Sequence, residues 1–283
     1  MSKILELFGR STLSLGFAEL KDILKKQICP FTKTRCFKTR KSQSDISIGT
    51  CCVQYGKDNK NILICPDRLL YKNQVFCDCI HLLTLHEPGN EFHIVPEISV
   101  PGGSIDFFLA SVHKGKVKDF VGIEFQTMDT TGTVWPERQR FLAEKKIKVD
   151  AADIQSAKPF GMNWKMTAKT TLVQLHHKIE TIEYLGKHLV LVAQDHLLEY
   201  MKREFCFAHL KSPGKIGDSM HIHSYSLNQS DSSFSLSLKE RWSTDTAGIA
   251  TCLGLAAETK VELQTILQEL ERKISNKSLM VIP

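Results

Sequence analysis

The chain has 283 residues, of which 42% are hydrophobic and 24% charged, which is ordinary globular usage and excludes wholesale disorder. Its formal net charge of +6 favours a polyanionic partner without requiring one. Because no run approaches the roughly 18 consecutive apolar residues that cross a bilayer, no secretion signal opens the sequence and the nine cysteines are odd in number, we expect a cytoplasmic protein with reduced thiols.

Residues 1–80 are predicted to form a small N-terminal module. Apolar residues at spacings of three to five between positions 3 and 25 predict one or two short helices. From residue 28 to about 71 the composition shifts to cysteine, lysine and short β-prone runs at 50–54 and 61–64. Seven basic residues and no acidic one lie within 25–41. This cluster suits phosphate contact, and a solvated surface is the equally weighted alternative.

Residues 81–283 are predicted to form an α/β (α+β) core. Apolar alternation and turn residues predict a meander of three strands, and a continuous apolar run at 189–193 predicts a strand buried on both faces. Leu172, Leu175, Ile179 and Ile182 recur at helical spacing, so a helix over 165–185 should cover the sheet. Further helices are expected at 196–205 and 257–276, and a strand pair or an exposed loop at 224–238. The three meander strands are expected at 92–95, 104–112 and 119–128.

Acidic residues in two of these apolar strands are the first candidate site. If the strands form a hairpin centred on Gly115, Asp106 faces Glu124, close enough for both carboxylates to hold one Mg²⁺. Gln126 shares a strand face with Glu124 and could orient a water or a phosphate without neutralising charge. Solvated strand carboxylates are the alternative, but an unpaired charge in an apolar strand usually marks a site.

The cysteines of the N-terminal module are the second candidate site. Thiolates from Cys29, Cys36, Cys65 and one of Cys51 and Cys52 could enclose one tetrahedral metal ion. Their spacing is looser than that of common zinc ribbons, so buried structural thiols compete with this interpretation.

Several ordered motifs resemble the NotI-type restriction endonucleases over about residues 28–205. The motifs are Cys-Pro-Phe at 29–31, Gly-Thr-Cys at 49–51, Ile-Cys-Pro-Asp-Arg-Leu at 64–69, Gly-Gly-Ser-Ile-Asp at 102–106, Gly-Ile-Glu-Phe-Gln-Thr-Met-Asp-Thr-Thr-Gly-Thr at 122–133, Asn-Trp-Lys-Met at 163–166 and Gln-Leu-His-His-Lys at 174–178.

The resemblance implies a PD-(D/E)XK nuclease core, with a central mixed sheet flanked by helices, and a metal-stapled N-terminal module. It implies a type II site-specific deoxyribonuclease that cuts double-stranded DNA with Mg²⁺, acts as a homodimer on a palindromic site and has a partner DNA methyltransferase. By the same resemblance Asp106, Glu124 and Gln126 match the nuclease motif, with Glu97 as an additional acid. The resemblance also implies that Cys29, Cys36, Cys51 and Cys65 are the ligands of iron or zinc in the module.

Basic residues after the acidic strand are candidates for DNA contact. Arg138 and Arg140 suit bidentate contact with guanine or phosphate, and Lys165, Lys169 and Lys178 could follow the DNA backbone, unless they form a solvated helix face. A surface position is expected for His221 and His223. The alternatives to a restriction enzyme are a DNA-binding protein with an inactive nuclease fold and a structure-selective repair nuclease.

Overall fold

A six-stranded mixed sheet forms the centre of the protein. The structure is a computed structural model that describes residues 3–155, 160–230, 232–255, 267–268 and 271–272. The strand order is β14-β13-β12-β9-β8-β7, with β12 parallel to both of its neighbours and all other pairs antiparallel. The strands are β7 (Glu91–Val100), β8 (Gly103–His113), β9 (Lys116–Gln126), β12 (His188–Gln194), β13 (Met220–Gln229) and β14 (Phe234–Thr244). The predicted meander and mixed sheet are confirmed, and the segment around 224–238 is a strand pair.

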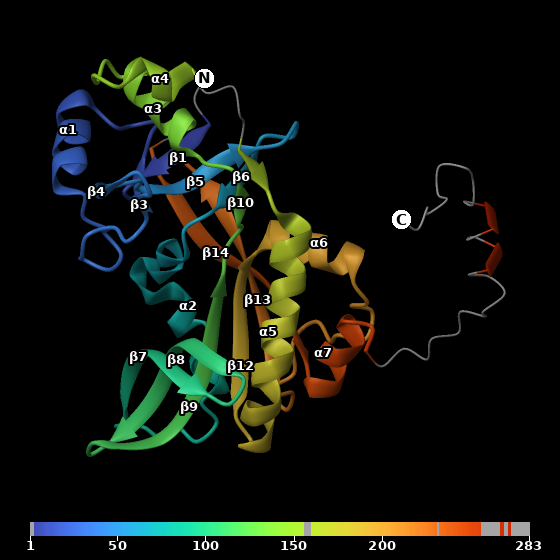
Figure 1. Ribbon diagram of the computed structural model, residues 1–283. Helices are drawn as coiled ribbons and strands as arrows, with labels where there is room; N and C mark the ends of the chain where they lie inside the picture. The colour runs from blue at the N-terminus through green and yellow to red at the C-terminus, as the bar shows by residue number, and fades with distance from the viewer. Residues whose placement is uncertain (1–2, 156–159, 231, 256–266, 269–270, 273–283) are drawn as a thin grey trace, which may run out of the picture.

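Helices cover both faces of this sheet (Figure 1). One face packs against α5 (Trp164–Tyr184), α6 (Asp195–Glu204) and α7 (Thr246–Cys252), and the other against η1 (Pro66–Asn73), α2 (Gln74–Cys77) and η2 (Ile80–Leu82). On β12, Leu189 and Leu191 belong to the first core cluster, while Val190 and Val192 belong to the second. The strand is therefore buried on both faces, as its continuous apolar run predicts. The apolar stripe predicted for α5 is also buried.

A second, four-stranded sheet in the order β2-β1-β5-β6 forms most of the N-terminal region. Its strands are β1 (Ile4–Leu7), β2 (Arg10–Ser11), β5 (Thr50–Tyr55) and β6 (Lys60–Leu63), and it is accompanied by α1 (Phe17–Lys26), β3 (Thr39–Arg40) and β4 (Gln43–Ser47). Of the one or two short helices predicted within 3–25, broken around residues 11–16, the second is present as α1, and the first is wrong. Backbone pairing of β1 with β5 overrides the helical spacing there, because β1 is buried along its whole length.

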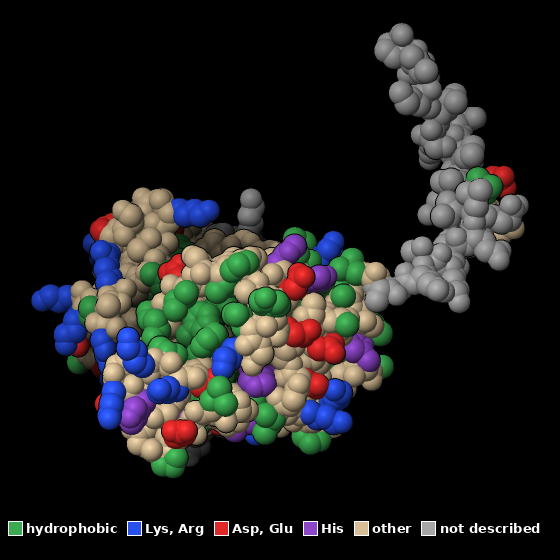
Figure 2. Space-filling model, turned by 90° about the horizontal axis from the view of Figure 1, so that it is seen from below, with side chains coloured by type: hydrophobic (Ala, Val, Ile, Leu, Met, Phe, Trp, Pro, Cys, Tyr) green, Lys and Arg blue, Asp and Glu red, His purple; other side chains and the backbone are tan. Residues whose placement is uncertain are grey.

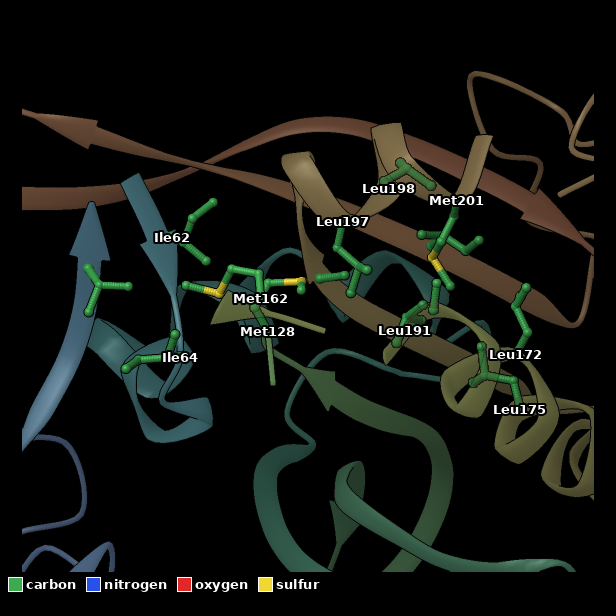
Figure 3. Close-up of a cluster of buried hydrophobic side chains, with 14 of the residues drawn as sticks. Ile62, Ile64, Met128, Met162, Leu172, Leu175, Leu191, Leu197, Leu198 and Met201 are labelled. Atoms are coloured by element: carbon green, nitrogen blue, oxygen red, sulfur yellow. The ribbon is translucent and has the colours of Figure 1, made fainter. Parts of the chain in front are cut away.

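The two sheets contribute to both core clusters. Gln194 at the end of β12 accepts a hydrogen bond from Leu63 N–H at 2.9 Å and donates one to Asn61 O at 2.6 Å. Figure 3 shows Ile62 and Ile64 beside Met128 and Met162, in a cluster that continues to side chains of α5 and α6. The end of β9 is thus held against the N-terminal sheet.

The remaining short elements lie near this junction. They are α3 (Trp135–Glu144), α4 (Ala151–Gln155) and the pair β10 (Thr130–Thr131) and β11 (Gly161–Met162). The helix predicted at 257–276 lies almost entirely outside the described residues. Among the helices that the structure describes, none is both long and apolar enough to cross a membrane.

Candidate active site

The hairpin of β8 and β9 brings Asp106 and Glu124 opposite each other. Phe107 pairs with Ile123, so the next position along the ladder places Asp106 across from Glu124, as predicted from the sequence. The turn consists of two residues, Lys114 and Gly115, both with positive φ. A one-residue register shift after Ser111 then moves the ladder to the predicted alignment.

A backbone hydrogen bond holds the Asp106 carboxylate in place. Its Oδ2 accepts from the Phe125 backbone N–H at 2.8 Å, and its residue remains open to solvent. Partial burial raises the pKa of Asp106, while the Phe125 N–H acts in the opposite direction.

The Glu124 carboxylate is less exposed than that of Asp106. Its side chain is 12% exposed, and Oε1 accepts a hydrogen bond from Lys178 Nζ at 2.7 Å. Burial raises the pKa of Glu124 to about 7; repulsion from Asp106 adds to this, and Lys178 opposes it. Two carboxyl groups with raised pKa values stand together, an arrangement that a bound cation would stabilise.

The other two predicted acid-strand residues lie beside this pair. Glu97 has φ 44° and lies in β7 between the paired positions Pro96 and Ile98, which places it across from Asp106. Its negative charge contributes to the raised pKa of Asp106. Gln126 ends β9 and donates from Nε2 to Thr127 O at 2.7 Å. Three neighbouring strands therefore contribute to one small polar region.

Carboxylate oxygens carry more lone pairs than these hydrogen bonds use, and they are the ligands that Mg²⁺ prefers. The donor set of Asp106 and Glu124 therefore fits a divalent cation. Ile123 and Phe125 alternate with Glu124 and pack into the opposite core cluster, as predicted. The ring centroid of Phe125 lies 6.0 Å from that of Phe76 and 5.0 Å from that of Phe107. The strand that carries Glu124 is therefore packed against the core.

A pocket of about 930 Å³ adjoins the Gln126 end of β9. Its lining includes Lys38, Arg40 and Lys41 from the basic cluster, together with segment 125–130. Arg40 also pairs with Asp153 at 2.8 Å and lies over the ring of Trp135 at 4.6 Å. The basic part of the N-terminal module and the end of the acidic strand thus face one shared space.

The predicted DNA-contact residues have different environments. Lys165 and Lys169 are exposed on α5, and Arg140 is half-buried and paired with Glu137 at 2.6 Å. Arg138 is buried, and burial lowers its pKa to about 10. Its Nε donates to Ile48 O at 2.7 Å, which gives it a structural role joining α3 to the N-terminal module, so we leave it out of the proposed DNA surface.

The four predicted metal-binding thiols lie after α1 (Cys29 and Cys36), on β5 (Cys51) and just after β6 (Cys65). Cys29 N–H donates to Thr34 O at 2.7 Å and closes the loop that carries Cys29 and Cys36. Cys51 on β5 reaches Cys65, and Ile64 N–H donates to Cys51 O at 3.0 Å. Burial raises the pKa of the Cys36 thiol, with smaller contributions from Cys65 and Cys29. All four are buried.

The neighbouring Cys52 faces a different group. Its Sγ lies 2.8 Å from Glu6 Oε2, and Glu6 in turn pairs with buried Arg68 at 2.8 Å. Because adjacent strand residues point to opposite faces, Cys51 and not Cys52 is turned towards Cys65. Four thiols are of the ligand type that tetrahedral iron or zinc prefers. No three of the sulfur atoms of these four described residues lie within 4.8 Å of one another, so they are spread more widely than the ligand group described next.

Within the described residues, Asp195, His196 and Glu199 are the single group of three metal-type ligand atoms within 4.8 Å of one another. Sequence inspection missed this group, although its spacing at the start of α6 is visible. Lys239 Nζ lies 3.2 Å from both Asp195 Oδ2 and Glu199 Oε1, so an internal cation already offsets the two charges.

Two further predictions about individual side chains are wrong. His221 and His223, expected at the surface, are buried on β13, and His223 Nδ1 lies 3.7 Å from Cys79 Sγ. Lys178, expected on a helix face following DNA, is buried against Glu124. Helical spacing could have indicated its burial, because Lys178 lies three residues after Leu175 and one before Ile179 on the buried stripe of α5.

No protein-family model matches the chain, and the comparison with curated proteins finds no match. Conclusions about its activity therefore rest on the site itself.

Proposed function

We propose that the chain is a type II site-specific restriction endonuclease with a PD-(D/E)XK fold, acting in the cytoplasm on phosphodiester bonds of double-stranded DNA. The observation that carries this proposal is the pair of facing carboxylates, Asp106 and Glu124, on adjacent strands. Glu97 across β7 and Gln126 at the end of β9 complete the group.

In this proposal Asp106 and Glu124 hold Mg²⁺, which would polarise the scissile phosphodiester and activate water. Asp106 is kept in position by the Phe125 N–H and Glu124 by Lys178. Gln126 offers an amide donor and acceptor on the same strand, suited to orienting a water molecule. Packing of the Phe125 ring against Phe107 restrains the strand, which favours a fixed geometry of the two carboxylates.

DNA approaches, we propose, along the pocket beside Gln126. Lys38, Arg40 and Lys41 line it and supply positive charge for phosphate contact. Lys165 and Lys169 on α5, with Arg140 on α3, are further proposed contacts. The thiols of Cys29, Cys36, Cys51 and Cys65 are proposed to hold iron or zinc, which would fix the loop that precedes these basic residues.

A homodimer is proposed because two active sites related by a two-fold axis match the symmetry of a palindromic site. The edge strand β7 exposes Phe92, Ile94 and Ile98 at 45%, 38% and 41%, and Figure 2 shows hydrophobic side chains gathered on the face seen from below. A cognate DNA methyltransferase would protect the host sites. Sedimentation of the chain with a palindromic duplex in Ca²⁺ should give two chains per duplex; one chain per duplex would contradict the dimer.

One observation favours the alternative of a DNA-binding protein that no longer cuts, namely that the ammonium of Lys178 already neutralises Glu124. Incubation of the purified chain with a large DNA of known sequence, with Mg²⁺ or with EDTA, separates the functions. Discrete Mg²⁺-dependent fragments are expected. A smear would instead indicate a structure-selective repair nuclease, and retarded but intact DNA a binding protein.

A further inference from the structure

Lys178 lies in an unusual environment for a lysine. It belongs to the buried stripe of α5, three residues after Leu175 and one before Ile179, and its side chain is 9% exposed. Burying a lysine is costly unless its charge is paired. The ammonium meets this requirement at Glu124 Oε1, 2.7 Å away.

The chain entering β8 is shaped around this side chain. Gly102 has φ +92°, and a Cβ there would lie 2.0 Å from His177 O. Gly103 has φ +133°, and its Cβ would lie 3.2 Å from Lys178 Cε. Thr181 Oγ1 donates to Pro101 O at 3.3 Å. The turn that leads to Asp106 therefore rests directly on the turn of α5 that carries Lys178, at positions where glycine is needed for both space and conformation.

Charge gives this placement a function. Asp106, Glu124 and one phosphodiester bring three negative charges into a partly buried site, Glu97 beside Asp106 adds a fourth, and a single Mg²⁺ offsets two of them. Gln126 adds none, because an amide is neutral. A fixed cation in such a site stabilises developing negative charge without having to reorganise during the reaction.

We propose that Lys178 is the positioning cation of the active site, delivered from helix α5, and that it orients the Glu124 carboxylate and offsets one of the negative charges that Mg²⁺ leaves uncompensated. This inference rests on the proposed nuclease function. According to this inference the Lys178–Glu124 pair takes part in turnover. The alternative is that Lys178 occupies the metal site and prevents a metal ion from binding there.

The chain contains a matched control pair. Lys187 Nζ lies 2.6 Å from Asp119 Oδ1, and Asp119 is buried on the same strand as Glu124. Both pairs join a lysine at or just after α5 to a carboxylate of β9, but only the Glu124 pair adjoins Asp106. Removing the lysine of either pair should therefore lower the stability of the protein. Only removal of the lysine paired with Glu124 should slow turnover.

The test compares the parent with Lys178→Met, Lys178→Arg and Lys187→Met. Single-turnover cleavage in Mg²⁺ is measured beside Ca²⁺ affinity and DNA affinity in Ca²⁺, with thermal melting as a check on folding. Lys178→Met should slow cleavage by roughly 100-fold or more, the size of effect seen when a preorganised stabilising group is removed. Its Ca²⁺ affinity should be at least that of the parent, because a competing positive charge has gone. Lys178→Arg should recover most of the rate, and Lys187→Met should keep it.

Unchanged or faster cleavage by Lys178→Met, with tighter Ca²⁺ binding, would show that Lys178 is a block and would overturn the inference. Parallel loss of melting temperature, Ca²⁺ binding and cleavage, with no recovery in Lys178→Arg, would assign it a merely structural role and overturn it as well. A parent that never cuts DNA would instead refute the proposed function on which the inference rests.

Discussion

Replacing Asp106 by asparagine should change stability and activity in opposite directions. The pKa of Glu124 is raised from 4.5 to about 7, a shift equivalent to about 3 kcal/mol at ~1.4 kcal/mol per unit. Burial is the largest cause and repulsion from Asp106 a smaller one, so removing the Asp106 charge should stabilise the metal-free protein by about 1 kcal/mol above pH 7. The same substitution removes one of two metal-binding carboxylates. Cleavage should then fall by about 10³-fold or more, since the metal supplies several kcal/mol of transition-state stabilisation.

The sign of the pH effect follows from the raised pKa. Folded Glu124 retains its proton up to about pH 7, whereas in the unfolded chain it loses the proton near 4.5, so its contribution to stability declines as pH rises through that interval. Urea unfolding in the presence of EDTA measures the free energy of unfolding of Asp106→Asn and of the parent at pH 5 and pH 8. The stabilisation of Asp106→Asn relative to the parent should appear mainly at pH 8.

Asp119→Asn is the matched control, because it breaks the buried pair with Lys187 on the same strand. It should lower the free energy of unfolding and keep the cleavage rate. Asp106→Asn protein that folds and cuts within tenfold of the parent rate would refute the metal-binding role of the carboxylate pair.

Two further predictions concern the thiols and the buried histidines. Cys29→Ser should lose the module's metal and lower the melting temperature. Cys52→Ser should keep the metal, because the Cys52 thiol faces Glu6. The amount of metal bound per chain is measured for both variants, and a full complement in Cys29→Ser would contradict the ligand assignment. Burial lowers the pKa of His223 to about 3 in the folded protein. In the unfolded chain the same imidazole binds a proton near pH 6.5, so the free energy of unfolding falls as the pH decreases below 6.5. Between pH 7 and pH 4 the free energy of unfolding of His223→Leu should therefore rise by about 3 kcal/mol relative to that of the parent. The exposed-site control His93→Leu should show no such gain. If the unfolding free energies of His223→Leu and the parent had equal pH slopes, this would argue against a buried neutral imidazole.

Local sequence patterns are sufficient to predict the acidic strands. Alternation fixes which side chains share a face, and Lys114-Gly115 marks the turn. Without the register shift after Ser111 this turn would pair Asp106 with Ile123, so the facing of Asp106 and Glu124 also depends on a bulge that no sequence pattern indicates. The continuous run of β12 is equally informative, because a strand buried on both faces needs no alternation.

Predictions fail where long-range contacts decide the outcome. Residues 4–11 have apolar spacing that suits a helix, but backbone pairing of β1 with β5 and of β2 with β1 makes them strands. Arg138 resembles any exposed helix arginine in sequence, yet carbonyl oxygens of residues 47 and 48, some ninety positions earlier, bind its guanidinium. Lys178 is separated by 54 residues from the carboxylate it meets. Pattern and propensity contain no information about such partners.

The basic cluster of residues 25–41 illustrates the same limit and leads to a further consequence. Its composition indicates affinity for phosphate, but its place beside Gln126 depends on the Arg40–Asp153 pair and on the loop that carries Cys29 and Cys36. A metal held by these thiols would fix the backbone immediately before Lys38, which lines the pocket. Metal loading and DNA affinity should therefore be linked even though the thiols lie outside the carboxylate pair. Cys29→Ser should accordingly weaken DNA binding in Ca²⁺, whereas Asp106→Asn, which leaves the basic cluster in place, should retain it.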